Sequence, residues 1–418
     1  MGRLSFILCA AAMAALASGA DAQPMSPATK ARIDRILRST PLIDGHNDLP
    51  GELRDKYGGR TAVVAAGSDR LKQPLMTDIA RMRTGGMGGQ FWSVFIPGTI
   101  TGNDAIRATI EQVDIARRLI ATYPRDLELA STADDMVRIH RGRRIGSLLG
   151  IEGGRQIGGS LAALRLFHAL GVRYATLTHN QTTEWADSAT DVPKHGGLSP
   201  FGERVVGEMN RLGMLVDLSH VSPDTMRDAI RVSRAPVIFS HSNAFALNPH
   251  PRNVPDDVLR LLPANGGIVM VNFYPAFLAP AATDWARNRT AEDARLKAVH
   301  PTSTEAQSAA LTAWEAAHPR PRVGVAVVAD HIDHIARTAG VDHVGIGGDL
   351  DGVPYTVDGL GSVADYPLLF AELIRRGWND RDLAKLAGGN ILRAMRGAES
   401  TALALKDVPP ALDPLQPN

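Results

Sequence analysis

The chain has 418 residues, and its 45 Lys and Arg against 44 Asp and Glu give a net charge of +1. Hydrophobic residues make up 44% and there is one Cys, a mixture that excludes disordered, fibrous and disulfide-built proteins. A charge near zero also argues against a nucleic-acid-binding protein, which would carry a clustered basic excess. The length allows one large domain or two to three smaller ones.

Residues 1–22 have the features of a secretory signal peptide. Arg3 gives a positive start, residues 4–17 form an apolar run that is short for a bilayer span, and Ala20-Asp21-Ala22 fits a cleavage site. The mature chain would then begin at Gln23 and lose the only cysteine, Cys9. An uncleaved anchor is the alternative. We expect an exported protein, periplasmic or secreted, with no membrane anchor in the mature chain.

Short apolar runs alternate with longer amphipathic stretches along the rest of the chain, a pattern typical of repeated βα units. We predict strands at residues 41–46, 90–96, 145–151, 174–179, 215–220, 236–241, 267–273 and 343–348. We predict helices at 104–121, 161–170, 200–212, 223–232, 256–262, 324–339, 364–376 and 380–395. This order predicts an α/β fold, a (β/α)8 TIM-like barrel. A doubly wound sheet is less favoured, because residues 44–48 after the first strand are not a glycine-rich phosphate loop.

One segment departs from this alternation. Residues 272–322 are rich in Ala, Thr and Pro, and we interpret them as a partly helical insertion in the loop after a strand. No change of composition and no Pro- or Gly-rich linker divides the remainder. We therefore expect a single (β/α)8 domain over residues 23–418 with an insertion around 272–322.

Residue types that bind metal ions follow one predicted strand after another. They are His46, Asp48, Glu152, His179, His220, His241, Asp349 and Asp351. In a (β/α)8 barrel the carboxyl ends of all strands meet at one mouth, where active sites lie. These side chains are therefore predicted to face one pocket.

The spacing of these residues indicates how they could share metal ions. His46 and Asp48 are two apart in an extended segment, so both side chains point to one side and can reach one ion. Imidazole with carboxylate suits Zn²⁺ and related divalent ions. His220 and His241 are one compact αβ unit apart and could share a second ion, with Glu152 bridging the two. Two ions held in this way could activate a water and polarise a carbonyl.

Taken alone, each of these residues also has a purely structural explanation. Glu152 could be the buried partner of Arg155, and His179 could cap its strand. Asp349 could belong to a turn, since Asp and Gly are turn-forming residues. Only the coincidence of so many strand ends favours a metal site.

A second cluster resembles a metal motif but does not follow a strand. His331 and His334 lie three apart on a predicted helix with acidic neighbours. We expect this cluster to be a solvated helix face rather than a metal site.

Eight segments of the chain match a known family. They are LIDGHNDLP at 42–50, GGQFWSV at 88–94, GIEGG at 150–154, LTHN at 177–180, VDLSHVS at 216–222, FSHSN at 239–243, HPRN at 250–253 and GIGGDLDG at 345–352. With these segments the chain resembles the membrane (renal) dipeptidase family of zinc peptidases, from about residue 30 to about residue 397. No single segment is specific, but together they are.

The resemblance implies a binuclear zinc site, with two zinc ions per chain, in a (β/α)8 barrel. His46 and Asp48 would hold one zinc, His220 and His241 would hold the other, and Glu152 would bridge them. A water or hydroxide between the ions would attack the peptide carbonyl.

The resemblance also implies roles for three further residues. His179 would hydrogen-bond the carbonyl oxygen and the developing oxyanion. Arg252 would pair with the C-terminal carboxylate of the substrate, a task suited to a bidentate guanidinium. Asp349 would carry the proton to the leaving amine. The implied enzyme is a zinc metallopeptidase that hydrolyses dipeptides with a free C-terminal carboxylate.

The chain departs from the mammalian members of that family in two respects. Without Cys9 it has no cysteine for their disulfides, one of which links subunits, and residues 415–418 are no hydrophobic tail for a lipid anchor. Covalent dimers and membrane attachment are therefore not expected. A non-covalent homodimer stays open, and dipeptide substrates, not nucleic acids, are the expected partners.

Two other functions are less favoured. A lactonase or β-lactam hydrolase of the amidohydrolase type would need a carbamylated Lys as its bridge, and no Lys follows a predicted strand. A protein that captures peptides without cleaving them would not need Asp349 beside a complete set of ligands. A panel of dipeptides would separate the three.

Overall fold

The structure is a computed structural model, and it describes residues 25–413. The predicted signal peptide, with Cys9, lies outside the described residues. The described strands are β1 Leu42–Asn47, β2 Met87–Phe95, β3 Leu127–Leu129, β4 Ile145–Glu152, β5 Val172–Thr176, β6 Leu215–Asp217, β7 Ile238–Phe239, β8 Ile268–Val271 and β9 Val344–Ile346. The first helices are α1 Pro27–Ser39, α2 Leu49–Tyr57, α3 Ile79–Thr84, α4 Gly102–Thr122, α5 Ala133–Arg141, α6 Leu161–Ala169, α7 Pro200–Leu212 and α8 Pro223–Val232. They are followed by α9 Asp256–Leu259, α10 Leu262–Asn265, α11 Pro275–Leu278, α12 Pro280–Val299, α13 Thr304–Ala317, α14 Val325–Thr338, α15 Tyr366–Arg375, α16 Asp380–Ala384 and α17 Asn390–Ala404.

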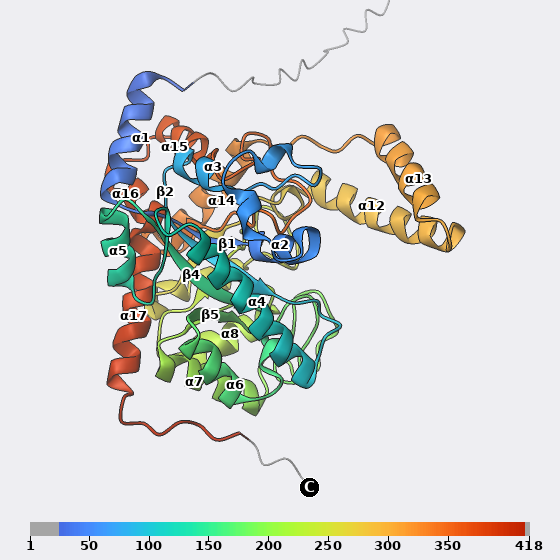
Figure 1. The fold of residues 1–418 in the computed structure, drawn as a ribbon. Helices are drawn as coiled ribbons and strands as arrows, with labels where there is room; N and C mark the ends of the chain where they lie inside the picture. The colour runs from blue at the N-terminus through green and yellow to red at the C-terminus, as the bar shows by residue number, and fades with distance from the viewer. Residues whose placement is uncertain (1–24, 414–418) are drawn as a thin grey trace, which may run out of the picture.

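Eight of the strands close into a parallel barrel ringed by helices (Figure 1). Their order is β2-β1-β9-β8-β7-β6-β5-β4, and β2 pairs with β4, from Gly89–Gly146 to Phe95–Glu152, to close the ring. The predicted (β/α)8 barrel is confirmed, and each predicted strand overlaps one barrel strand. No helix among the described residues is long and apolar enough to cross a bilayer.

A ninth strand, β3, was not predicted. It pairs in parallel with the beginning of β4, with Leu127 opposite Ile145, whereas β5 pairs with β4 only from Leu149 onward. β3 therefore extends the sheet at the end of the barrel where the strands begin. A strand of three residues is too short to show a periodic pattern in the sequence.

Local sequence signals set the bounds of the helices that return the chain to the next strand. Before α7 the hydroxyl of Ser199 accepts a hydrogen bond from the N–H of Gly202, and a proline opens the helix. The same helix ends at Gly213, which has a left-handed φ of 74°. α8 begins in the same way after Ser222. Because each helix runs back along the barrel, all strands point their carboxyl ends to one mouth.

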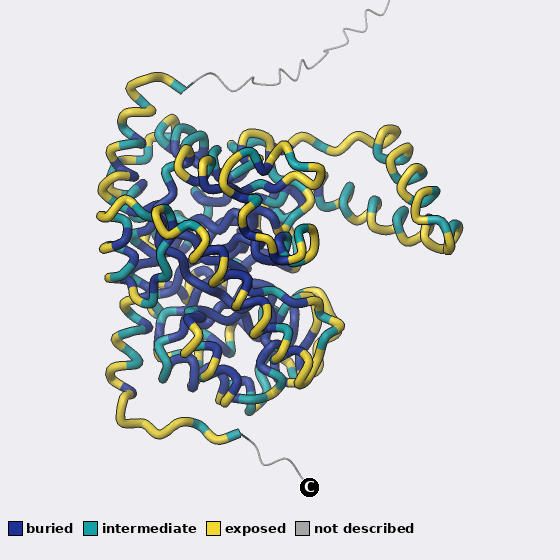
Figure 2. Tube along the Cα trace, viewed as in Figure 1, coloured by how far each residue is buried: buried dark blue, intermediate teal, exposed yellow. Residues whose placement is uncertain are grey.

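The hydrophobic core has two parts, and both are buried in Figure 2. The larger part lies where the helices pack against the outside of the barrel. The smaller part includes Ile43, Phe91, Leu148 and Tyr174 from the strands, with residues of α17 such as Ile391. The strand residues of this smaller part point to the inside of the barrel. On β4, Glu152 lies four residues beyond Leu148, and side chains an even number of residues apart in a strand point to the same face, so Glu152 also points inward. The strand thereby directs this carboxylate into the mouth of the barrel.

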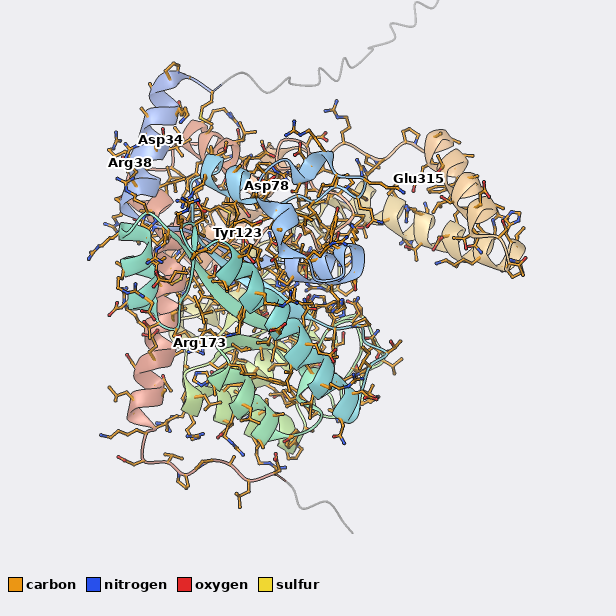
Figure 3. The ribbon with its side chains drawn as sticks, viewed as in Figure 1. Asp34, Arg38, Asp78, Tyr123, Arg173 and Glu315 are labelled. Carbon is orange, nitrogen blue, oxygen red and sulfur yellow. The ribbon has the colours of Figure 1, made fainter. Side chains whose placement is uncertain are left out.

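Between β8 and α14 the chain leaves the barrel as a helical hairpin made of α12 and α13 (Figure 1). None of the residues of α13 is buried, and Figure 2 shows the hairpin exposed along much of its length. Glu315 of α13, labelled in Figure 3, pairs with Arg289 of α12, with Oε1 and Nε 2.6 Å apart. The hairpin lies within the segment where we predict an insertion.

Candidate functional site

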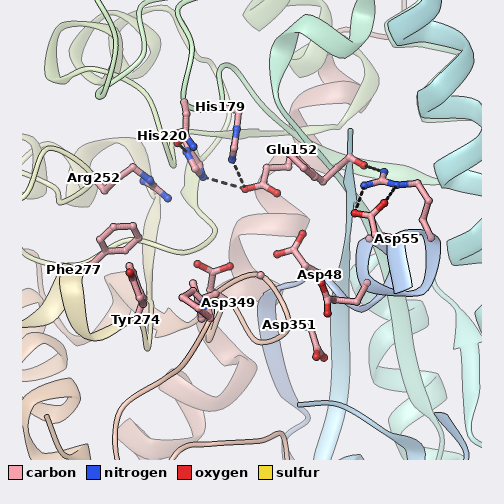
Figure 4. A pocket seen from close by; sticks show the side chains of 18 residues that line it. Asp48, Asp55, Glu152, His179, His220, Arg252, Tyr274, Phe277, Asp349 and Asp351 are labelled. Carbon is pink, nitrogen blue, oxygen red and sulfur yellow. Dashed lines mark hydrogen bonds and ion pairs between the residues drawn. The ribbon is translucent and has the colours of Figure 1, made fainter. Parts of the chain in front are cut away.

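The structure brings the predicted site residues together at the mouth of the barrel (Figure 4). A cavity of about 360 Å³ is lined by Asp48, Glu152, His179, His220, Arg252 and Asp349. His46 and His241 lie beneath its wall and are buried, with exposures of 0% and 1%. Only His46 and Glu152 belong to strands, and the other residues stand in the loops that follow β1, β5, β6, β7 and β9.

Glu152 stands between two groups of ligand atoms. Its Oε2 lies 3.3 Å from Nε2 of His46, and that nitrogen also lies 3.1 Å from Oδ2 of Asp48. Its Oε1 lies 3.0 Å from Nε2 of His220 and 3.6 Å from Nε2 of His241. The two oxygens of one carboxylate therefore face different ligands, as a bridging carboxylate requires.

The donor atoms of the site fit a metal centre. Three sets have ligand atoms within 4.8 Å of one another, namely His46-Glu152-His241, Glu152-His179-His220 and His46-Asp48-Asp349. Imidazole nitrogens with carboxylate oxygens are the donors that zinc and related divalent ions prefer. The sets share Glu152 and His46, so they form one continuous cluster of ligand atoms.

The structural explanation considered for Glu152 does not hold. Arg155 donates hydrogen bonds to the carbonyl oxygens of Gly98 and Thr182, and not to Glu152. Asp351 also lines the mouth, but its Oδ1 accepts from the backbone N–H of Met76 at 2.6 Å. Asp351 belongs to none of the ligand sets found among the described residues.

The expectation of a solvated helix face is wrong for His331. Its side chain is completely buried on α14, where Nδ1 accepts from the N–H of Ala244 at 3.1 Å. Its Nε2 donates to the carbonyl of Leu278 at 3.0 Å. His334 pairs with Asp256 at 2.8 Å. Neither histidine belongs to a metal-ligand set in the described part of the chain.

Three histidines of the site are held through Nδ1, which turns Nε2 toward Glu152. The pairs are Tyr174 Oη with His46 (2.8 Å), Ser240 Oγ with His241 (2.8 Å) and Asn180 Oδ1 with His220 (3.2 Å). Such partners fix the tautomer and orientation of metal-binding histidines. Tyr174 reaches His46 over Gly150, where any side chain would overlap the tyrosine ring. Tyr174 and Asn180 are 128 and 40 residues from the histidines they hold, so no local pattern identifies them, and a serine next to a histidine, as at Ser240, is too common to be a signal.

Two buried carboxylates that we did not predict hold the loops that carry the ligands. Asp44 accepts from the backbone N–H of His46 at 2.8 Å and of Gly348 at 2.9 Å, and so joins β1 to β9. Asp217 accepts from two backbone N–H groups in the loops after β6 and β7, at 3.1 and 2.8 Å. The available signal, an Asp shortly before a ligand His, also fits an ordinary turn.

Burial and the charges of neighbouring groups together set the protonation states of the site. Burial and nearby cationic groups hold the pKa values of His220 and His241 well below the ordinary value, so both imidazoles stay neutral and can bind metal. Although burial opposes it, His46 lowers the pKa of Glu152 well below its usual range. Burial raises the pKa of Asp349 to about 8, and nearby carboxylates act in the same direction. Asp349 can therefore hold a proton near neutral pH.

The mouth also concentrates backbone strain. Among the described non-glycine residues, those with positive φ are His220, Asp349, Asp351 and Arg143, and three of these four lie at the site. Left-handed φ values of 71° for His220 and 60° for Asp349 are unfavourable for residues with a Cβ. Asn272 donates to Oδ2 of Asp349 at 2.7 Å and fixes that carboxyl.

Arg252 is a buried cation with unused hydrogen-bond donors. Its exposure is 2%, and its Nε and Nη1 have no hydrogen-bond partner among the described residues. Its Nη2 donates to the carbonyl of His241 at 3.4 Å, and its Cζ lies 5.3 Å from the centre of the Phe277 ring. Burial lowers the pKa of Arg252 to about 10, although Asp349 and Glu152 act in the opposite direction. A buried guanidinium with free donors at a cavity is suited to binding an anion.

The cavity has opposite charges on its two sides (Figure 4). Arg252 lies on one side with the rings of Phe277 and Tyr274, and Asp48 and Asp351 lie on the other. A small ligand that carries both an anionic and a cationic end fits this arrangement.

Comparison with known proteins identifies the same family as the sequence motifs. Residues 30–408 match the family described as membrane dipeptidase, peptidase family M19. The chain is 41% identical over 397 residues to the dipeptidase aclJ of Aspergillus oryzae, covering 93% of this chain and 85% of that protein.

Solved structures share the fold. The probable dipeptidase PvdM from Pseudomonas aeruginosa superposes with a TM-score of 0.76 at 24% identity, covering 90% of this chain and 100% of that one. The dipeptidase AC, a metallopeptidase of family M19, gives 0.71 at 25% identity, with 86% and 99% covered. A metallopeptidase from Rhodobacter sphaeroides, liganded with a phosphinate mimic of the dipeptide L-Ala-D-Ala, gives 0.70 at 24% identity, with 86% and 99% covered. With the family match over nearly the whole described chain, this protein belongs to the membrane dipeptidase family, peptidase family M19, and is a metallo-dipeptidase.

Proposed function

We propose that the protein is a zinc dipeptidase with two ions per chain, and that it hydrolyses dipeptides with a free C-terminal carboxylate. The observation that carries this proposal is the position of Glu152. Its Oε2 faces His46 and its Oε1 faces His220, at 3.3 and 3.0 Å, so one carboxylate reaches two places where an ion can bind.

The proposed ligands divide around this carboxylate. His46 and Asp48 would hold one ion, His220 and His241 would hold the other, and Glu152 would give one oxygen to each. Three imidazoles among the donors support zinc over Mg²⁺ or Ca²⁺, which prefer oxygen ligands. When bound, the two ions would polarise the scissile carbonyl and lower the pKa of the water that attacks it.

Two side chains at the mouth would act on the reacting groups. The His179 side chain is 22% exposed, and its Nε2 lies 3.7 Å from Oε1 of Glu152, so it can donate to a substrate carbonyl oxygen beside the ions. Asp349, oriented by Asn272, would give a proton to the leaving amine.

Arg252 would select the free C-terminal carboxylate. Its Nε and Nη1 have no partner among the described residues, and Nη2 has a second N–H besides the one it donates to His241. Nη2 together with Nε or Nη1 can therefore donate two parallel hydrogen bonds to one carboxylate. The side of the cavity opposite Arg252, where Asp351 lies, suits the ammonium group of the substrate (Figure 4). The dipeptide mimic bound by the similar Rhodobacter sphaeroides peptidase supports a ligand of this size.

A panel of dipeptides with metal analysis would test the proposal. It would include L-L and L-D dipeptides as free acids and as C-terminal amides, incubated with purified protein whose zinc content is measured. We expect two zinc ions per chain and efficient cleavage of the free acids alone. Active protein without metal, or equal cleavage of acids and amides, would contradict the proposal.

We also propose that residues 1–22 direct export and that cleavage leaves Gln23 as the first residue. The basic start, apolar run and Ala-Asp-Ala site support this proposal. N-terminal sequencing of the exported protein would test it, and a mature chain that retains Met1 would refute it.

A further inference from the structure

A continuous series of aromatic rings joins the active-site cavity to the α12–α13 hairpin. Tyr274 and Phe277 line the cavity, with ring centres 5.0 Å apart. Tyr274 lies 5.4 Å from Tyr355, and Tyr355 lies 6.0 Å from Trp285 of α12. The edge-to-face geometry of these three pairs is an attractive arrangement for aromatic rings. The base of the hairpin therefore contacts the cavity wall through one intermediate ring, Tyr355.

Tyr355 has a second contact with the segment that follows the hairpin. The Cζ of Arg320 lies 3.7 Å from the centre of the Tyr355 ring, within cation–π distance. The indole N–H of Trp285 donates to the carbonyl of His318 at 2.7 Å, which ties this segment to α12. Trp285 and Arg320 thus hold the same tyrosine. Residues 352–354, directly before it, line the cavity.

The contact between Tyr355 and Tyr274 bears on function because Tyr274 lies on the same side of the cavity as Arg252. The Phe277 ring lies 5.3 Å from Cζ of Arg252, and Tyr274 packs against Phe277 on the same side of the cavity (Figure 4). If Arg252 binds the C-terminal carboxylate, as proposed above, the side chain of the C-terminal residue must lie close to these two rings. Such a surface favours apolar and aromatic side chains.

We propose that Trp285 and Arg320 are positioning residues that keep Tyr355 against Tyr274, so that the enzyme prefers dipeptides with a large apolar C-terminal residue. The proposal rests on the proposed function, in which Arg252 binds the substrate carboxylate. Neither Trp285 nor Arg320 is among the described residues that line the cavity, so both act through Tyr355. The hairpin thereby becomes part of the specificity of a site that it does not enter.

The test compares two substrates on zinc-loaded, full-length protein. KM and kcat would be measured with L-Ala-L-Phe and L-Ala-Gly for the wild type and for Trp285→Ala, Arg320→Ala and Trp285→Phe. We expect both alanine variants to raise KM for L-Ala-L-Phe about three- to tenfold, the loss expected for one aromatic or cation–π contact. KM for L-Ala-Gly, kcat and zinc content should stay unchanged, and Trp285→Phe should restore much of the affinity because it keeps a ring beside Tyr355.

Trp314→Ala is the matched control. Trp314 stands on α13, where its ring lies 6.1 Å from that of Trp285 and 4.5 Å from that of His318, and no ring contact with Tyr355 is found among the described residues. This variant should lose as much stability as Trp285→Ala, but its KM values for the two substrates should equal those of the wild type. Equal changes for the two substrates, no change in either, or the same selective change in Trp314→Ala would overturn the proposal. Failure of the proposed function would show instead in the wild type, which would then not cleave free-acid dipeptides.

Discussion

Replacing Arg252 with Met should raise the free energy of unfolding and lower the activity, because the buried charge of Arg252 destabilises the folded state. Arg252 is 2% exposed, and burial lowers its pKa from 12.5 to about 10. That lowering corresponds to about 3 kcal/mol against the charged form in the folded state, at every pH below about 10. Met carries no charge and no N–H group that would be buried without a partner. Loss of the cation–π contact with Phe277 reduces the expected gain in stability by about 1 kcal/mol. We expect the free energy of unfolding to rise by about 1–2 kcal/mol.

The same substitution should remove most of the affinity for free-acid dipeptides. Two charge-assisted hydrogen bonds to a carboxylate together contribute about 3–4 kcal/mol, so kcat/KM should fall about 10²- to 10³-fold, mostly through KM. For dipeptide amides, kcat/KM should fall by less than about tenfold. Steady-state kinetics on L-Ala-L-Ala and its amide, with urea unfolding followed by tryptophan fluorescence, would measure both effects.

Arg165→Met is the control for the gain in stability. Arg165 is also partly buried, but its Nη1 lies 3.0 Å from Oε1 of the buried Glu208, so its removal leaves a carboxylate with one partner fewer. This variant should lose stability where Arg252→Met gains it. The reasoning about Arg252 would be refuted if Arg252→Met unfolds at lower urea than the wild type. Equal loss of activity on acids and amides would refute the carboxylate role alone.

Three further predictions concern the metal site and the core. Glu152→Gln offers one ligand oxygen in place of two. Zinc measured by mass spectrometry should therefore fall below two ions per chain, and activity should fall about 10²-fold. Full zinc content in this variant would argue against a bridging role for Glu152. Asp349→Asn should lower kcat about 10²- to 10³-fold with zinc retained, whereas parallel loss of zinc would make Asp349 a ligand. Burial lowers the pKa of His331 from 6.5 to about 4, so between these values the unfolded chain binds a proton that the folded chain does not. In the metal-free protein His331 should therefore contribute a loss of up to about 3 kcal/mol of stability as the pH falls from 6.5 to 4. Urea unfolding should show a loss that is smaller by about this amount in His331→Gln.

The barrel could be predicted because its strands are buried on both faces and appear in the sequence as continuous apolar runs. Every residue of β1 and β4 is buried, for example. The same reasoning failed for β3, which is three residues long. It also did not resolve α12, which buries only Ala282 and Leu296, or α13, which buries no residue. A helix that packs only on its neighbour gives no clear amphipathic signal.

The candidate ligands could be found because they lie at the ends of strands or in the loops that follow them, but most of their supporting residues could not. Tyr174 lies 128 residues from His46 and reaches it only because Gly150 leaves room for its ring. His331 looked solvated because helical periodicity shows which residues share a face, but not what covers that face. In both cases the decisive neighbours come from distant parts of the chain.

The positions of Glu152 and His220 relative to their strands account for the difference between their backbone conformations. On β4, Leu148 belongs to the inner core, so Glu152, four residues later, points into the mouth with ordinary strand geometry. On β6, Leu215 belongs to the inner core, so an extended chain would turn His220, five residues later, to the outside. β6 instead ends at Asp217, whose carboxylate accepts backbone hydrogen bonds in place of the sheet, and His220 takes a φ of 71° that redirects its ring. A left-handed residue costs about 1–2 kcal/mol, and glycine, which would avoid that cost, has no imidazole to offer.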